Sequence, residues 1–231
     1  MIKRIGILFF IAFISVNSWS QEFIYNRGLV TLSIGPALPA YDFGMQKGIV
    51  LSSYAKVGTS INAEVSYFTN WNVGYNFMLV YNVNPVNTDQ LALAYMDASP
   101  AFQTTSAEAG AFRDIAGLGG FVFDVPVVEK MSFTFKMMAG LRNVHKPNSL
   151  VKTTTVFSAI DYYETSDNSM IFAFLFGMGG RFMVNDLFNI HLNANYMGST
   201  IDFKYYRNKK VIKQKAHIGV LSVLLGVSYA F

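Results

Sequence analysis

Apolar and polar residues alternate with a period of two along most of this chain, which is the pattern of a β-strand with two different faces. The clearest run is 187–197, where Asn189, His191 and Asn193 alternate with large apolar residues. The run 215–231 continues the alternation to the last residue, Phe231. Six further runs follow the same rule, at 28–35, 57–67, 72–82, 120–125, 132–142 and 170–182. The pattern therefore predicts eight strands.

The connections between these runs alternate in length. Short turns cover 68–71, 128–130 and 185–186, whereas long connections cover 36–54, 84–117, 144–168 and 198–214. A strand that crosses a bilayer at a tilt needs about 9–11 residues, and outer-membrane barrels combine short periplasmic turns with long extracellular loops. The sequence thus predicts an all-β fold, an eight-stranded antiparallel up-and-down transmembrane β-barrel. A soluble periplasmic β-sandwich is the alternative, but it gives no reason for loops of alternating length. Within the second long connection, 88–96 has helical character.

Composition favours the barrel and removes several other classes. Hydrophobic residues make up 52% of the chain and aromatic residues 16%, which a membrane barrel displays to lipid and a soluble domain of this size must bury in a large core. The absence of cysteine excludes a lipid-anchored lipoprotein, disulfides and thiolate metal sites. Removing Lys3 and Arg4 lowers the formal charge from +4 to +2, too mild to indicate a nucleic-acid partner.

The first twenty residues are typical of a secretory signal peptide. A short basic segment precedes an uncharged apolar stretch at 5–16 that is too short to span a bilayer as a helix. Ser18 and Ser20 place small residues at the positions that signal peptidase reads, so we expect cleavage before Gln21. The expected organisation is a signal peptide at 1–20 and one outer-membrane barrel domain at 21–231, located in the cell outer membrane.

Four short segments resemble the Bacteroidota outer-membrane β-barrel domain family, which includes proteins called PorT-like. They are LSIGPALP at 32–39, YDFG at 41–44, AKVG at 55–58 and the terminal SYAF at 228–231. The resemblance implies the barrel fold and the outer-membrane location. It implies no catalytic residue, because the family has no common reaction. The terminal aromatic Phe231 is similar to the signal read by the barrel-assembly machinery, which is therefore an expected partner.

Several charged residues are expected to point into the barrel in its periplasmic half: Glu64, Asp124, Lys136, Arg181 and His191. Counting from the short turns places Arg181 near-opposite His191 across one hairpin and Glu64 near-opposite Asn76 across another. Asp124 lies diagonally from Lys136. Eight strands enclose an interior that side chains just fill, and charges shielded from water must be paired. We therefore expect a polar plug, with a gated pathway for a small solute or ion as the alternative.

Basic residues gather in the fourth long connection, at the predicted extracellular end. They are Lys204, Arg207, Lys209, Lys210, Lys213 and Lys215. Phosphates of lipopolysaccharide lie at that level and accept charge-assisted hydrogen bonds, so lipopolysaccharide contacts are one hypothesis and a solvated loop is the other. Tyrosines near the strand ends fit an aromatic girdle: Tyr54, Tyr67, Tyr81, Tyr196 and Tyr229.

No enzyme signature emerges from the candidate chemistry. A lipid hydrolase needs a serine, a histidine and a carboxylate in contact. His145 is predicted at a strand end and His191 in the lumen, and the outward-facing His217 has no outward serine on neighbouring strands and no carboxylate beside it. The acidic residues at 161–167 are too loosely spaced for a calcium loop. We predict no catalytic residue, no cofactor and no metal.

The pattern favours a non-enzymatic barrel with a lumen filled by side chains, whose extracellular loops or wall contact a partner such as another outer-membrane protein. A small-solute or ion transporter is the alternative, and a lipid-modifying enzyme is a distant third. Outer-membrane lipid and lipopolysaccharide are the expected surroundings.

Overall fold

The structure is a computed structural model, and it describes residues 28–44, 53–69, 72–97, 102–155, 158–164, 167–207 and 210–231. The predicted signal peptide at 1–20 lies outside these residues, so its cleavage stays a prediction.

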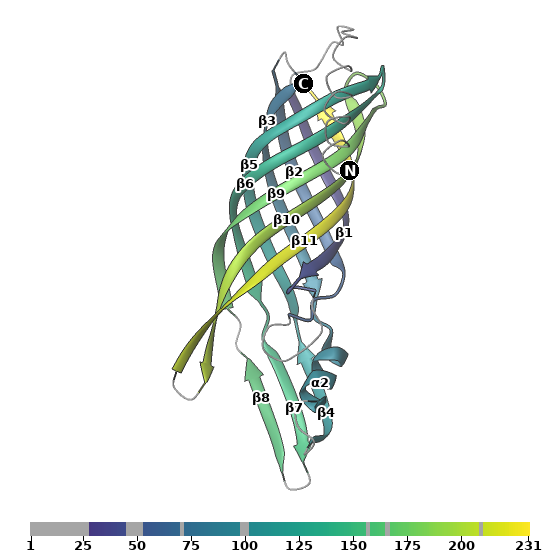
Figure 1. Cartoon of the computed structure of the whole chain (residues 1–231). Coiled ribbons are helices and arrows are strands. Elements are labelled where there is room, and N and C mark those ends of the chain that lie inside the picture. The colour runs from purple at the N-terminus through teal and green to yellow at the C-terminus, as the bar shows by residue number, and fades with distance from the viewer. Residues whose placement is uncertain are drawn as a thin grey trace, which may run out of the picture.

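Eight strands form a closed antiparallel barrel, which confirms the predicted fold class (Figure 1). The barrel strands neighbour one another in the order in which they occur along the chain. β1 pairs with β11 and closes the barrel. The barrel strands are β1 (Gly28–Tyr41), β2 (Gly58–Phe68), β3 (Val73–Pro85), β5 (Ala111–Val128), β6 (Met131–Lys146), β9 (Asp167–Met183), β10 (Phe188–Arg207) and β11 (Lys210–Ala230).

The two ends of the barrel differ, as the connection lengths predict. At one end, here called the short-turn end, β1 begins and β11 ends. The short connections from β2 to β3, from β5 to β6 and from β9 to β10 also lie at this end. The long connections lie at the opposite end, the long-loop end (Figure 1). The start of β1 and the end of β11 therefore lie side by side at the short-turn end.

The long-loop end is more structured than the sequence pattern predicts. The helix α2 (Thr88–Asp97) matches the predicted helical segment. Three strands, β4 (Phe102–Ala109), β7 (Ser149–Thr155) and β8 (Ala159–Glu164), form a separate sheet in the order β4-β7-β8. The sequence pattern assigns 84–117 and 144–168 to long connections and does not predict these strands. β4 and β7 are short and rich in threonine and small residues, and β8 has only 6 residues, so none of them shows a long alternation of large apolar side chains. We call α2, β4, β7 and β8 together the platform.

The predicted fourth connection is also paired backbone rather than a loop. The pairing of β10 with β11 continues beyond the barrel wall to Arg207 and Lys210. The neighbouring strands stop earlier, because β9 pairs with β10 only as far as Ser199 and β1 pairs with β11 only as far as Ile218. The segments 200–207 and 210–217 thus form a two-stranded ribbon that projects from the long-loop end (Figure 1).

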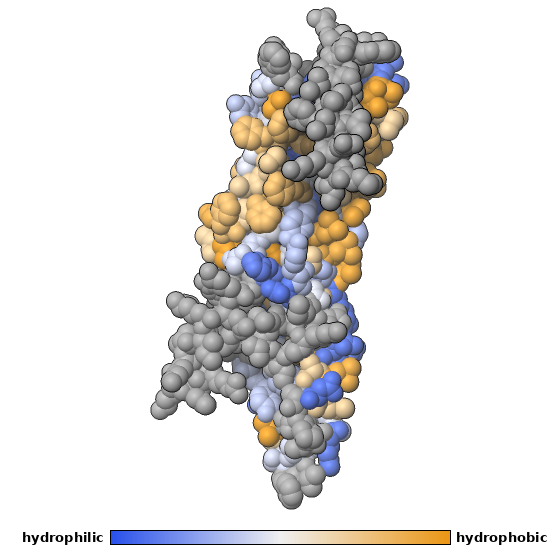
Figure 2. Space-filling model, viewed as in Figure 1, coloured by the Kyte–Doolittle hydropathy of each residue, from blue (hydrophilic) through white to orange (hydrophobic). Residues whose placement is uncertain are grey.

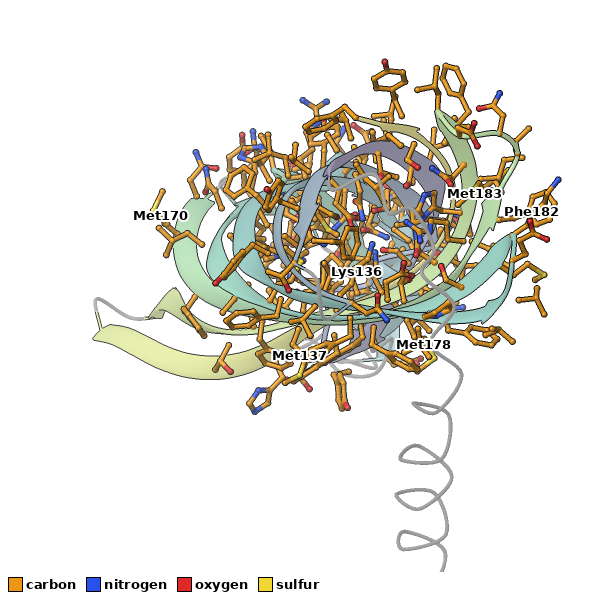
Figure 3. The ribbon with its side chains drawn as sticks, turned by 90° about the horizontal axis from the view of Figure 1, so that it is seen from above. Lys136, Met137, Met170, Met178, Phe182 and Met183 are labelled. Atoms are coloured by element: carbon orange, nitrogen blue, oxygen red, sulfur yellow. The ribbon has the colours of Figure 1, made fainter. Side chains whose placement is uncertain are left out.

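The barrel's outer surface is apolar, as a lipid-facing wall must be. Outward side chains such as Leu32, Phe172 and Leu225 are 61–64% exposed. Apolar residues gather on the visible part of the barrel wall (Figure 2). Successive residues point to opposite sides, so Met137 lies outside and Lys136 inside (Figure 3). No helix among the described residues is long and apolar enough to cross a membrane.

Aromatic residues lie on the outer wall near both ends. Tyr67, Tyr81 and Tyr229 are exposed, as a girdle requires. The sequence predicts Tyr54 as part of this girdle, but Tyr54 is 1% exposed, and its carbonyl accepts the backbone N–H of Asn87 at 2.7 Å.

The closing seam gives a first testable prediction. The backbone N–H groups of Gly28 and Phe231 each donate to the other residue's carbonyl at 3.0 Å, and the Phe231 ring covers the Gly28 backbone. Phe231→Asp removes that ring and adds a charge to an outward position. We expect loss of heat-modifiable migration on gels and accumulation of degraded protein, whereas Phe231→Tyr should assemble normally. Wild-type membrane levels of the Asp variant would contradict this role.

Candidate functional site

The first ion pair crosses the lumen between strands that are not neighbours. The Lys136 ammonium on β6 lies 2.6 Å from Oε2 of Glu64 on β2. Two more donors reach the other carboxylate oxygen, with Asn76 Nδ2 at 2.8 Å and Ser66 Oγ at 3.2 Å. Both charged side chains are buried. The Glu64 carboxylate is therefore satisfied by donors from three strands.

The second ion pair lies closer to the short-turn end. Arg181 on β9 bonds through Nη2 to the Asp124 carboxylate on β5, and its Nε donates to Ser132 Oγ at 3.1 Å. The guanidinium carbon also lies 5.9 Å from the centroid of the Phe68 ring, within the range of a cation–π contact. Phe68 thus covers this pair from the end of the barrel.

His191 completes the predicted luminal set. Its Nε2 lies 2.7 Å from Ser228 Oγ on β11, and the strand register places it opposite Arg181, the position that turn counting predicts. Ser228 also accepts from Asn189 Nδ2 at 3.2 Å. The His191 ring therefore hydrogen-bonds to a side chain of the neighbouring strand β11 and belongs to neither ion pair.

Pairing across the lumen differs from what hairpin counting suggests. Asp124 is diagonal to Lys136 in the register, as expected, but each bonds to a different partner. Asn76 lies opposite Ser66 and diagonal to Glu64, near-opposite as expected, and donates to the Glu64 carboxylate. Counting along hairpins relates only adjacent strands, whereas a closed barrel brings distant strands face to face.

A glycine beside Lys136 provides space for the Asn195 side chain. Gly177 on β9 is the register partner of both Lys136 and Asn195. A Cβ at Gly177 would lie 2.4 Å from Asn195 Oδ1 and 3.4 Å from Lys136 Cβ. Side chains from β6 and β10 therefore occupy the volume that a larger residue would need.

A third ion pair in the long-loop half was missed by the sequence analysis. Arg142 on β6 bonds to the Asp114 carboxylate on β5, and its Nη1 donates to Ser199 Oγ at 3.0 Å. Asn82 Nδ2 donates to Asp114 Oδ1 at 3.0 Å. Arg142 lies on the inward face of the predicted strand 132–142, and this position alone indicates a buried charge that needs a partner. The partner, Asp114, falls within the predicted connection 84–117, so the sequence pattern does not identify the pair.

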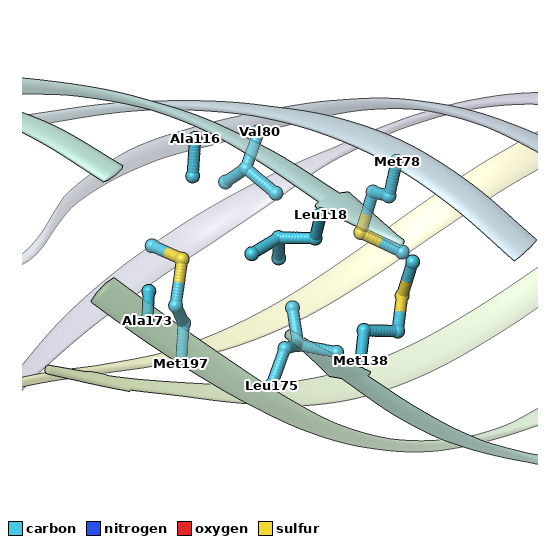
Figure 4. Packing of buried hydrophobic residues seen from close by; sticks show 8 residues of the cluster. All are labelled: Met78, Val80, Ala116, Leu118, Met138, Ala173, Leu175 and Met197. Atoms are coloured by element: carbon cyan, nitrogen blue, oxygen red, sulfur yellow. The ribbon is translucent and has the colours of Figure 1, made fainter. Parts of the chain in front are cut away.

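An apolar layer separates the polar groups of the two halves. Its residues come from five strands and face one another across the lumen (Figure 4): Met78, Val80, Ala116, Leu118, Met138, Ala173, Leu175 and Met197. All are at most 4% exposed. Three flexible methionines in this set fit irregular gaps between branched side chains. On these five strands the interior therefore changes from polar to apolar and back along the barrel axis, and the buried Asn62 of β2 contacts this layer through Met78 Sδ at 3.7 Å.

Apolar side chains also close both ends of the lumen. At the short-turn end a cluster contains Leu29, Phe68, Val122 and Ala230. At the long-loop end, Phe43 from the turn after β1 packs edge-to-face on Phe112 at 5.2 Å between ring centroids. The charged luminal side chains described above are between 0% and 6% exposed. Side chains thus fill the described lumen.

The remaining histidines form no catalytic arrangement among the described residues. His217 Nδ1 lies 3.1 Å from Thr200 Oγ1. The Asp42 carboxylate is closer to His217 than the sequence suggested, but it accepts the backbone N–H at 2.8 Å and not a ring proton. No cluster of metal-binding side chains occurs in the described part of the chain.

The basic residues predicted to contact lipopolysaccharide belong to the ribbon. The register pairs Lys204 with Lys213 and Arg207 with Lys210. Their side chains, and the whole of Lys209, lie outside the described structure. The lipopolysaccharide hypothesis therefore stays a prediction.

Comparison with known proteins finds no protein family and no curated protein that matches the sequence. Solved structures with a similar fold include Neisserial surface protein A, 11% identical over 88% of this chain and 97% of its own, with a TM-score of 0.46. They also include Ail of Yersinia pestis in complex with sucrose octasulfate, 16% identical over 89% and 99%, at 0.43. Outer membrane protein AlkL is 13% identical over 92% and 94%, at 0.44. The resemblance to the Bacteroidota family stays a prediction.

The luminal ion pairs give a second testable prediction. Arg181→Leu leaves the buried Asp124 carboxylate without its cation, and breaking a buried pair in this way typically costs about 3–5 kcal/mol. We expect a clearly lower melting temperature in detergent, followed by circular dichroism. Arg113→Leu is the matched control, because Arg113 lies on the exposed face of β5.

A double variant separates charge loss from packing. Arg181→Leu combined with Asp124→Leu removes both charges, so it should be less destabilising than Arg181→Leu alone. Equal melting temperatures for wild type and Arg181→Leu would show that the pair does not stabilise the barrel.

Proposed function

We propose that this protein is a non-enzymatic outer-membrane barrel that does not conduct solutes and that binds a partner through its long-loop end. The observation that carries this proposal is the burial of the luminal charges, which are at most 6% exposed. A conducting pore needs a continuous path lined by water. The ion pairs, the apolar layer and the closed ends leave no such path among the described residues, which argues against the transporter alternative.

The platform supports the interaction part of the proposal. A barrel that serves only as a structural wall needs no second sheet at one end. The α2 helix packs on this sheet, with Tyr95 and Tyr162 at 5.4 Å between ring centroids. Large apolar side chains on it nevertheless remain exposed, among them Leu93, Met96 and Tyr163. Apolar groups exposed outside a membrane indicate a protein-binding surface.

The apolar wall and the loop asymmetry support the location and orientation. A closed barrel with a lipid-facing exterior is the form in which strands span bacterial outer membranes. By that analogy the short-turn end faces the periplasm and the platform faces the outside. Membership of the Bacteroidota barrel family is part of this proposal, and it rests on the four sequence segments described above.

Orientation is tested by thiol labelling on intact cells. The chain has no cysteine, so single-cysteine variants report one position each. Asn148→Cys at the long-loop end should react with a membrane-impermeant reagent, whereas Glu129→Cys in an exposed short turn should react only after lysis. Labelling of Glu129→Cys alone on intact cells would reverse the proposed orientation.

The function itself is tested by removing the platform. The register pairs Pro85 with Ala111 and Lys146 with Asp167, so short glycine-serine linkers can replace 88–109 and 148–165 without displacing a barrel strand. We expect wild type and the shortened chain to fold, and neither to show stable conductance in planar bilayers. Only wild type should retain a partner in a pull-down from native membranes in mild detergent.

Stepwise conductance of the wild type would favour the transporter instead. Equal retention of the same partner by both chains would indicate that the partner binds the barrel wall and not the platform.

A further inference from the structure

The platform ends in a strand with a free edge. β8 pairs with β7 on one side, and no described strand pairs with its other side. Its apolar residues Ile160, Tyr162 and Tyr163 are 37%, 38% and 63% exposed. Natural sheets usually protect such an edge, and an unprotected one readily accepts an added strand. The packing of Tyr95 against Tyr162 holds this edge in place before any partner arrives.

The ribbon offers a second free edge at the same end of the molecule. The residues of β11 that precede Ile218 pair only with β10. One side of the segment 210–217 therefore has no partner among the described strands. Figure 1 shows the ribbon and β8 both extending past the barrel wall at the long-loop end. Within one chain they belong to different sheets.

The sequences of the two edges are complementary. β8 contains Asp161-Tyr-Tyr-Glu164, and β11 contains Lys210-Val-Ile-Lys213, with the same spacing between the charged residues. β8 leads back to the barrel strand β9, and the 210–217 segment continues into the barrel part of β11, so both run toward the barrel. In two copies with the same orientation in one membrane these segments are parallel, and a parallel alignment places Asp161 opposite Lys210 and Glu164 opposite Lys213. The same alignment places Tyr162 opposite Val211 and Tyr163 opposite Ile212. Opposite charges and aromatic–β-branched pairs both stabilise neighbouring strands.

We propose that two copies of the chain dimerise at the long-loop end, with β8 of each copy pairing with the β11 segment of the other copy's ribbon. A two-fold axis makes both pairings equivalent, so the interface closes on itself. Pairing of β8 with a second β8 is disfavoured, since it brings acidic segments together. The proposal deepens the proposed function, because it identifies the partner of the platform as a second copy.

Charge reversal tests the pairing. The variant Asp161→Lys/Glu164→Lys and the variant Lys210→Glu/Lys213→Glu each place like charges along the interface when alone. Each should weaken the dimer by about tenfold or more relative to wild type. An equimolar mixture of the two variants restores opposite charges at both pairings, so a heterodimer of wild-type affinity is expected. Light scattering in detergent and native mass spectrometry measure these states.

Two controls keep the result interpretable. Asp89→Lys/Asp97→Lys reverses exposed charges on α2, outside the proposed strand pairing, and should leave the dimer unchanged. Heat-modifiable migration of every variant shows that its barrel has folded.

Three results would overturn the proposal. One is a monomeric wild type, which would leave the proposed function standing if the platform still retains another protein. The second is a mixture that forms no heterodimer, as expected if β8 and the ribbon pair within one chain. The third is an effect confined to the lysine variant and dependent on added lipopolysaccharide, which would favour lipid contacts for the ribbon.

Discussion

The structure depends on one constraint, which is that no backbone N–H or C=O group can face hydrocarbon without a partner. Each unsatisfied group there costs several kcal/mol, so strands cross a bilayer only as a closed barrel. The seam between β1 and β11 meets this requirement, and it extends to the reciprocal hydrogen bonds of Gly28 and Phe231. Closure then fixes which faces meet lipid and which enclose the lumen.

Closure creates a second requirement, because the enclosed polar groups lose access to water. The chain meets it with three ion pairs that also hydrogen-bond to neutral side chains. The apolar layer between them occupies the middle of the lumen, where no charge has to be satisfied. Burial of these charges makes the barrel a rigid support rather than a passage, and leaves recognition to the parts beyond the membrane.

Alternation by twos was enough to predict the number of barrel strands, most of the inward residues and the two ends, because each follows from the local geometry of a strand. The helix near Thr88 was also visible locally. The partner of Lys136 could not be identified from local sequence, because it depends on which strands face each other across the lumen of the closed barrel. Asp114 and the platform strands were missed for another reason. They lie in segments that are too short or too mixed in polarity to show a regular alternation of large apolar side chains.

The contact between Glu64 and Lys136 also has a kinetic meaning. Their strands are separated in the wall by β3 and β5, and the residues are 72 positions apart in the chain. Because the two residues meet only when β2 to β6 have curved into a wall, we expect this contact to form late in folding, after the rate-limiting state. Interactions of that kind slow unfolding without speeding folding. The pair accordingly contributes to how long an assembled barrel persists in the membrane.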